Sequence, residues 1–159
     1  MSNDPGLMLE IQALYARYAE LVDEGPLAQW PQLFVEDAIY KIVTRENLER
    51  GWSLALMLCE SRGGIEDRVN AIENLSMTIP RRVRHLISGF TLAPQGPLAW
   101  AVSANFAVFE TINGQGTTCF AAGRYKDIVT RQSDGALRFR EKISICDAAT
   151  INNSLVYPL

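Results

Sequence analysis

Residues 137–145 alternate between apolar and polar side chains, a pattern typical of a β-strand with one buried face. The apolar positions are Leu137, Phe139, Ile143 and Ile145, and the polar positions between them are Arg138, Arg140, Lys142 and Ser144. The pattern predicts that the first set faces a core and that the second forms a basic, solvated stripe. The end of the chain is therefore expected to belong to a sheet.

Three more strands are expected upstream of this one, over 83–92, 100–108 and 117–130. The second of them alternates strictly between larger apolar residues and small or polar ones. The pair Asn113-Gly114 marks a hairpin turn, because Asn-Gly accepts the positive φ that such turns need. Ser133-Asp134-Gly135 marks the turn before the last strand. The C-terminal half thus predicts a series of antiparallel strands.

The N-terminal third is expected to be helical. Asp4 can accept hydrogen bonds as an N-cap, and Pro5 suits the first helical position. A buried stripe at helical spacing follows and ends at Gly25-Pro26; it consists of Ile11, Leu14, Tyr15, Tyr18, Leu21 and Val22. A short second helix is expected over 27–34, and a strand over 38–43.

The middle of the chain is less regular. Asp37 is expected to mark the turn that precedes the strand at 38–43. The apolar run 52–59 fits a strand or a helix, and periodicity does not decide between them. Gly63-Gly64 is expected to break the chain. A helix is expected over 65–72, where Ile65, Val69 and Ile72 recur at helical spacing.

Helices followed by long antiparallel strands indicate an α+β fold, in which N-terminal helices cover one face of a curved sheet. Such a sheet closed by helices forms a cone with an interior pocket. The length of 159 residues predicts a single domain spanning 1–159. Small enzymes and assembly subunits can share this architecture, so the fold alone does not give the function.

The composition excludes several classes of function. The chain has a single histidine, His85, and three widely spaced cysteines, too few ligands for the common iron or zinc sites. The same odd cysteine count argues against a disulfide framework. A net charge of −3 gives no global support for nucleic-acid binding. Neither a signal peptide nor a membrane-spanning run is visible, so a cytoplasmic location and no membrane partner are expected.

Several stretches in a fixed order resemble the small (β) subunits of aromatic ring-hydroxylating dioxygenases, and together they cover most of the chain. They are Leu21 to Trp30, Leu33 to Tyr40, Glu66-Asp67-Arg68-Val69, Arg82 to Ser88, Ala121 to Asp127, and Ile145-Cys146-Asp147. The closest likeness is to subunits that serve aromatic carboxylates such as terephthalate, salicylate or anthranilate. Gly89 departs from the family pattern, in which many members have Asn at this position.

The resemblance implies the cone fold of the nuclear transport factor-like superfamily and a role without catalysis of its own. In this family the partner α subunit carries a Rieske iron–sulfur cluster and a mononuclear iron, and it dihydroxylates the aromatic substrate. These centres need several histidines, which this chain lacks. The chain would then carry no cofactor and would hold α subunits together, commonly as three α with three β.

Two groups of residues are candidates for the subunit interface. The run from Arg81 to His85 places four potential donors within five residues, and arginine is enriched at interfaces. The alternative is a strand-end cluster paired with local acids. The second group shares a strand with small residues that would let a partner approach, or would let the N-terminal helix pack closely. The candidate interface residues are Arg81, Arg82, Arg84, Arg124, Lys126 and Asp127.

A second hypothesis is a stand-alone cone-fold enzyme, an isomerase or dehydratase. His85 is expected to face inward if Arg84 faces outward, because neighbours on a strand point to opposite faces. It could then share a pocket with Asp23 as a general base and Tyr40 as an oxyanion donor, lined by Tyr18 and Trp30. The alternative is an aromatic core beside a helix-end carboxylate. A third hypothesis is a binding module for a small apolar acid.

Overall fold

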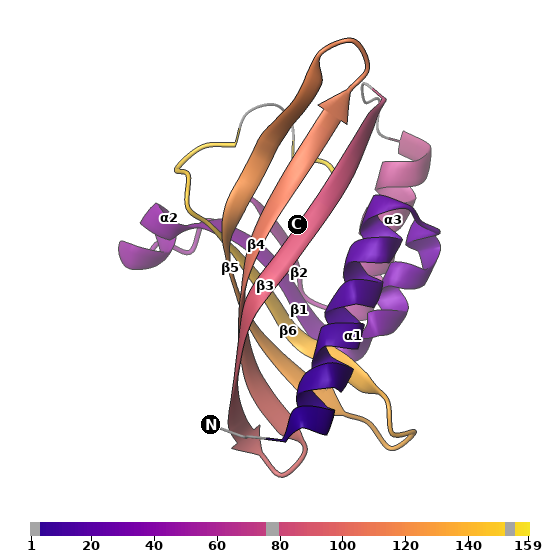
Figure 1. The fold of residues 1–159 in the computed structure, drawn as a ribbon, viewed down its shortest axis with the longest axis vertical. Coiled ribbons are helices and arrows are strands. Elements are labelled where there is room, and N and C mark those ends of the chain that lie inside the picture. The colour runs from indigo at the N-terminus through magenta and orange to yellow at the C-terminus, as the bar shows by residue number, and fades with distance from the viewer. Residues whose placement is uncertain (1–3, 76–79, 152–154) are drawn as a thin grey trace.

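The computed structural model describes residues 4–75, 80–151 and 155–159, and shows a long, twisted sheet with helices on one side (Figure 1). Helices α1 and α3 cover the same face of the sheet, whereas α2 lies away from them. In chain order the elements are α1 (Pro5–Asp23), the 3₁₀ helix η1 (Leu27–Leu33), β1 (Phe34–Thr44), α2 (Arg45–Glu49), β2 (Met57–Cys59), α3 (Arg62–Asn70), the π-helical turn η2 (Ala71–Leu75), β3 (Arg81–Gly96), β4 (Ala99–Ile112), β5 (Gly116–Arg131) and β6 (Leu137–Cys146).

Helix α1 forms as the sequence predicts. The Asp4 carboxylate accepts the backbone N–H groups of Gly6 and Leu7 at 2.9 and 3.3 Å, which satisfies two of the free donors of the first turn. The helix ends before Gly25, whose φ of 82° suits a residue without a Cβ. The expected apolar stripe is buried against the sheet, so this prediction is confirmed.

The middle of the chain corrects two expectations. Asp37 does not end a turn: it lies inside β1, which begins at Phe34 and has an irregular register before Ile39. Gly63-Gly64 does not break the chain either. The two glycines lie in the first turn of α3, where the Ser61 hydroxyl caps the helix by accepting the Gly64 N–H at 3.0 Å. Of the ambiguous run at 52–59, only Met57–Cys59 is a strand.

The six strands form one sheet in the order β2-β1-β6-β5-β4-β3. Neighbouring strands are antiparallel, except that β1 runs parallel to β6. The last strand of the chain is therefore central in the sheet and lies between β1 and β5. This register puts Tyr40 of β1 opposite Lys142 of β6. The predicted α+β fold is confirmed, with this parallel pair as an addition.

The predicted solvated stripe on β6 is wrong at Lys142 and Ser144, which are both fully buried, and Ile143, which was expected in the core, is only half-buried. Opposite β5, Ile128 pairs with Glu141 and Val129 pairs with Phe139, so Arg140 is an extra residue in a β-bulge. A bulge shifts the alternation of side chains by one position. Phe139 and Lys142 consequently both face the core, and the Lys142 side chain is fully buried.

Candidate functional site

The interior of the cone contains a buried carboxylate–imidazole pair. Asp23 ends α1, and its carboxylate accepts the backbone N–H of His85 at 2.8 Å while its other oxygen lies 2.6 Å from His85 Nδ1. Both side chains are almost fully buried, with exposed fractions of 3% for Asp23 and 0% for His85. An N–H on Nδ1 that donates to Asp23 leaves the Nε2 lone pair available, which is the arrangement of a general base. Nε2 has no partner among the described residues.

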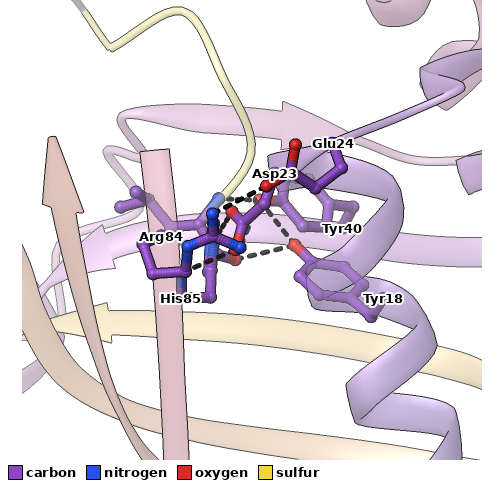
Figure 2. Close-up of polar contacts among 7 residues, drawn as sticks. Tyr18, Asp23, Glu24, Tyr40, Arg84 and His85 are labelled. Atoms are coloured by element: carbon purple, nitrogen blue, oxygen red, sulfur yellow. Dashed lines mark hydrogen bonds and ion pairs between the residues drawn. The ribbon is translucent and has the colours of Figure 1, made fainter. Parts of the chain in front are cut away.

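Three hydroxyl groups in the same interior form hydrogen bonds with the main chain of Leu159. Figure 2 shows two of the residues that carry them, Tyr18 and Tyr40, close to Asp23 and His85. The Leu159 main-chain oxygen accepts from the hydroxyl groups of Tyr18 at 2.7 Å, Tyr40 at 3.3 Å and Ser144 at 2.9 Å. The Leu159 N–H donates to the Tyr40 hydroxyl oxygen at 2.8 Å. These bonds hold Leu159 inside the cone, in the space where a pocket was expected, whereas residues 155–157 are half-buried.

The structure therefore brings the predicted pocket residues together but fills the space between them. Asp23 and His85 are in direct contact, whereas Tyr40 bonds Leu159 and lies 3.4 Å from the Tyr18 hydroxyl. The Trp30 ring packs edge-on against Tyr40, with 5.2 Å between centroids. Burial raises the pKa of Tyr40 and of Tyr18 well above the usual value, so both remain phenols that donate hydrogen bonds.

A buried ion pair lies beside this site, and the sequence analysis did not anticipate it. Lys142 Nζ lies 3.2 Å from Asp127 Oδ2 and 3.0 Å from the centroid of the Tyr125 ring. Asp127 also accepts the Tyr15 hydroxyl and, at 2.8 Å, the backbone N–H of Ile143. Burial lowers the pKa of Lys142 to about 8, although the Asp127 charge opposes that shift. Burial likewise raises the pKa of Asp127, against the opposing charge of Lys142.

Asp127 was grouped with Arg124 and Lys126 as an interface candidate, but its side chain faces the interior and is 0% exposed. Strand alternation accounts for the difference, because Arg124 and Lys126 point to the opposite face of β5 from Asp127 and Tyr125. The same alternation could have revealed from the sequence that Asp127 is buried. It would have grouped Asp127 with the core residue Tyr125.

The remaining interface candidates lie on two strands of the sheet. On β3, Arg84 is exposed and donates to Glu24 at 2.7 Å, and Arg82 is exposed. Arg81 instead forms a largely buried pair with Glu110 at 2.8 Å, which matches the alternative of pairing with local acids.

Across β4, the exposed residues Arg124 and Lys126 lie on the outer face of β5. Lys126 borders two hollows there. One, of about 510 Å³, is polar and also includes Arg124 and Asp147. The other, of about 500 Å³, is mostly apolar and includes Ile128 and Ile143. The outer face of β5 thus combines positive charge with concave surface.

The residues of this chain do not fit an iron site. A Rieske centre needs two histidines and two cysteines, and a mononuclear iron needs two histidines and a carboxylate, whereas the chain has one histidine in total. That histidine is bonded to Asp23. Within residues 4–75, 80–151 and 155–159 no group of three or more potential ligands converges. No helix in the described part is long and apolar enough to cross a membrane.

A curved sheet that wraps around an N-terminal helix and encloses a conical interior defines the nuclear transport factor-like fold. Within that fold, the family model described as "Ring hydroxylating beta subunit" matches residues 17–153, and the chain belongs to this family. The resemblance that the sequence motifs indicate is thereby confirmed.

Named relatives agree with this assignment over nearly the whole chain. The small subunit of anthranilate 1,2-dioxygenase from Burkholderia cepacia is 29% identical over 159 residues, which cover 100% of this chain and 98% of that protein. Subunit beta 1 of the terminal oxygenase component of terephthalate 1,2-dioxygenase from Comamonas sp is 28% identical over 151 residues, covering 95% and 97%. A crystal structure from Novosphingobium aromaticivorans, assigned to a beta subunit of an aromatic-ring-hydroxylating dioxygenase, superposes with a TM-score of 0.87 at 30% identity, covering 98% and 100%.

Proposed function

We propose that this chain is a non-catalytic β subunit that assembles with an iron-carrying α subunit into the terminal oxygenase of an aromatic ring-hydroxylating dioxygenase. The observation that carries the proposal is the family match over residues 17–153 in a chain whose single histidine is buried against Asp23. The Rieske cluster and the mononuclear iron would then belong to the α subunit. Electrons would reach that subunit from a reductase that uses a nicotinamide cofactor.

The substrate class that we propose is an aromatic carboxylic acid, and the α subunit would bind it. Two relatives are named for anthranilate and terephthalate dioxygenation, and both substrates are aromatic acids. The proposed assembly is cytoplasmic and contains three α and three β subunits, with this chain forming a single domain. In it, the interior of this chain would be structural.

We place the contact with the α subunit on the outer face of β3 and β5. Arg82 and Arg84 on β3 and Arg124 and Lys126 on β5 supply exposed positive charge. Arginine in particular can bind partner carboxylates through two parallel hydrogen bonds. The apolar hollow beside Lys126 adds a concave surface that a partner side chain can fill. Asp127 is not part of this surface because its carboxylate faces the interior.

Charge reversal tests this surface. We expect the R124E/K126E double variant to bind the co-expressed α subunit at least ten-fold more weakly, because two favourable charges become repulsive. The control is R17E in α1, on the opposite side of the molecule. It also reverses an exposed positive charge, and it replaces the Arg17–Glu20 ion pair with two like charges. This control should bind as the parent does. Parent-like binding by R124E/K126E, with its unfolding midpoint unchanged, would place the contact elsewhere.

The buried Asp23–His85 pair is the one observation that favours the second candidate function, a stand-alone isomerase or dehydratase. Its geometry suits a general base, and the Tyr40 hydroxyl is a hydrogen-bond donor, here to the Leu159 oxygen. Against it, Leu159 occupies the space between the hydroxyl groups of Tyr18, Tyr40 and Ser144. Activity of the isolated chain that His85→Ala abolishes would support this candidate. A His85→Ala variant that changes only assembly or stability would eliminate it.

A further inference from the structure

Residues 155–159 interact with the cone interior through the kinds of contacts that a small-molecule ligand makes. The Leu159 side chain is 1% exposed, and its main-chain oxygen and N–H are both hydrogen-bonded to side chains of the cone. Three hydroxyl donors, from Tyr18, Tyr40 and Ser144, converge on this one oxygen. They form a preorganised site for a carbonyl or carboxylate oxygen.

The same segment is held at a second place. The Arg68 guanidinium of α3 donates to the main-chain oxygens of Leu155 and Val156 at 3.2 and 2.8 Å. The Arg68 side chain thus holds the backbone of the segment, and the segment does not pair with a strand of the sheet. The segment is thus bound at two points by groups that belong to other elements.

The fit between the segment and the sheet is close. Residues Val156 to Leu159 and the strands β3 to β5 leave a cavity of only about 10 Å³ between them, bordered by Arg81 and Glu110. This is room for at most one water molecule. The described segment therefore fills the cone where it meets these strands.

Several buried polar atoms around the interior have no hydrogen-bond partner among the described residues. They are His85 Nε2, the Tyr125 hydroxyl, Trp30 Nε1, Arg68 Nε and Arg81 Nε. Buried polar atoms are normally satisfied, and exceptions concentrate at sites that bind or react. A molecule larger or more polar than Leu159 could satisfy some of them.

We propose that the cone interior is a binding site whose ligand is the chain's own segment 155–159, and that the site becomes available when this segment leaves. Its ligand class is a short apolar acyl compound with one N–H donor and one carbonyl or carboxylate oxygen, as in N-acetyl-leucine or the end of an apolar peptide. The branched side chain would replace that of Leu159, and the oxygen would take the three hydroxyl donors. The inference is independent of binding to the α subunit, because every group that it uses lies inside this chain.

Cleavage after folding tests the proposal on the full chain. A protease recognition sequence is inserted between Ala149 and Thr150, which are both exposed, so that the intact protein is purified first and cut afterwards. An excess of the peptide Leu-Val-Tyr-Pro-Leu with an N-terminal fluorophore is then added, and its polarisation is followed. We expect the cut protein to exchange its segment for the labelled peptide, and N-acetyl-leucine to displace that peptide. The uncut protein should bind neither.

Matched variants identify the site. Ser144→Ala in the cut protein should weaken peptide binding about two- to ten-fold, the range that corresponds to one hydrogen bond. Ser103→Ala removes a hydroxyl from the outer face of β4 and should have no effect. A peptide that ends in Asp in place of Leu should bind at least 100-fold more weakly, because a charge would enter the apolar end of the site.

The result that overturns the proposal is a cut protein that keeps its far-UV circular dichroism, releases its segment and binds neither peptide nor N-acetyl-leucine. If the cut protein unfolds when its segment leaves, refolding by added peptide tests the proposal. Refolding by added peptide, but not by the Asp-ended peptide, would support the site, whereas failure of both peptides would contradict it.

Discussion

Removing the buried charge of Lys142 should destabilise the protein strongly, and removing the charge of Asp127 in the same molecule should restore most of the loss. Both side chains are fully buried and lie 3.2 Å apart. Lys142→Met replaces the ammonium with an apolar group of similar length. It leaves the Asp127 carboxylate buried without a counter-charge.

The expected cost follows from the contacts that remain. Breaking a buried ion pair by removing one partner typically costs about 3–5 kcal/mol. Asp127 keeps two donors, the Tyr15 hydroxyl and the Ile143 N–H, so we expect Lys142→Met to fall near the lower end, at about 3 kcal/mol. Asp127→Asn should cost a similar amount, because the Lys142 ammonium is left without a counter-charge among the rings of Tyr15, Tyr18, Tyr125 and Phe139. The double variant should cost only about 1 kcal/mol, since no charge remains to be buried.

Urea unfolding of the parent, both single variants and the double variant, monitored by circular dichroism at pH 7, gives the four free energies of unfolding. The predicted coupling energy is about 5 kcal/mol, above the usual range of about 0.5–3 kcal/mol for residues in contact, because each single substitution leaves a buried charge without its partner. Effects of the two single substitutions that simply add in the double variant would refute the argument. Single substitutions that each cost less than about 0.5 kcal/mol, as at exposed sites, would refute it as well.

Two further predictions concern the same strands. The free energy of unfolding should rise between about pH 8 and pH 10, by at most about 1.4 kcal/mol per pH unit, because the pKa of Lys142 is about 8 in the folded state and near its ordinary value in the unfolded chain. This loss of charge differs from Lys142→Met, because a neutral Lys142 amine still donates a hydrogen bond to Asp127 and a Met side chain does not. Urea titrations at several pH values should show the rise, and Lys142→Met should remove it. Gly123→Ala should lower the free energy of unfolding by more than about 3 kcal/mol, because a Cβ there would lie 1.9 Å from the main-chain oxygen of Ile145. Thermal unfolding should show this loss. As a control, Ala122→Ser at the exposed neighbour should change the free energy of unfolding by less than about 0.5 kcal/mol.

The parts of the fold that the sequence predicts are those governed by local signals. Asp4, Pro5 and the apolar stripe define α1 because capping and helical periodicity act within a few residues. The hairpin between β4 and β5 forms at Asn113-Gly114, where Gly114 has a φ of 80°. These features need no information about distant contacts.

The errors arise where a distant contact overrides the local pattern. The sequence of residues 137–145 does not predict the bulge at Arg140, because the bulge depends on how β6 pairs with β5. That one extra residue moves Lys142 from the solvent to the core. The parallel pairing of β1 with β6 is likewise a property of the assembled sheet.

The candidate site divides in the same way. Strand alternation places His85 inside the cone and Arg84 outside, as the sequence predicts. The partner of His85 is Asp23, 62 positions earlier, and only packing of α1 against β3 makes that contact. No sequence motif predicts the position of Leu159, because an apolar segment binds an interior only where the folded chain forms a cavity of matching shape.

The most direct test of the proposed function is native mass spectrometry combined with iron analysis, on this chain alone and after co-expression with the iron-carrying protein encoded beside it. We predict that the chain alone contains no iron, and that co-expression gives a larger assembly that contains both chains and iron. A three-to-three mass ratio would support the proposed stoichiometry. A chain that stays separate from an iron-loaded, correctly folded neighbour would contradict the assignment as an assembly subunit of that oxygenase.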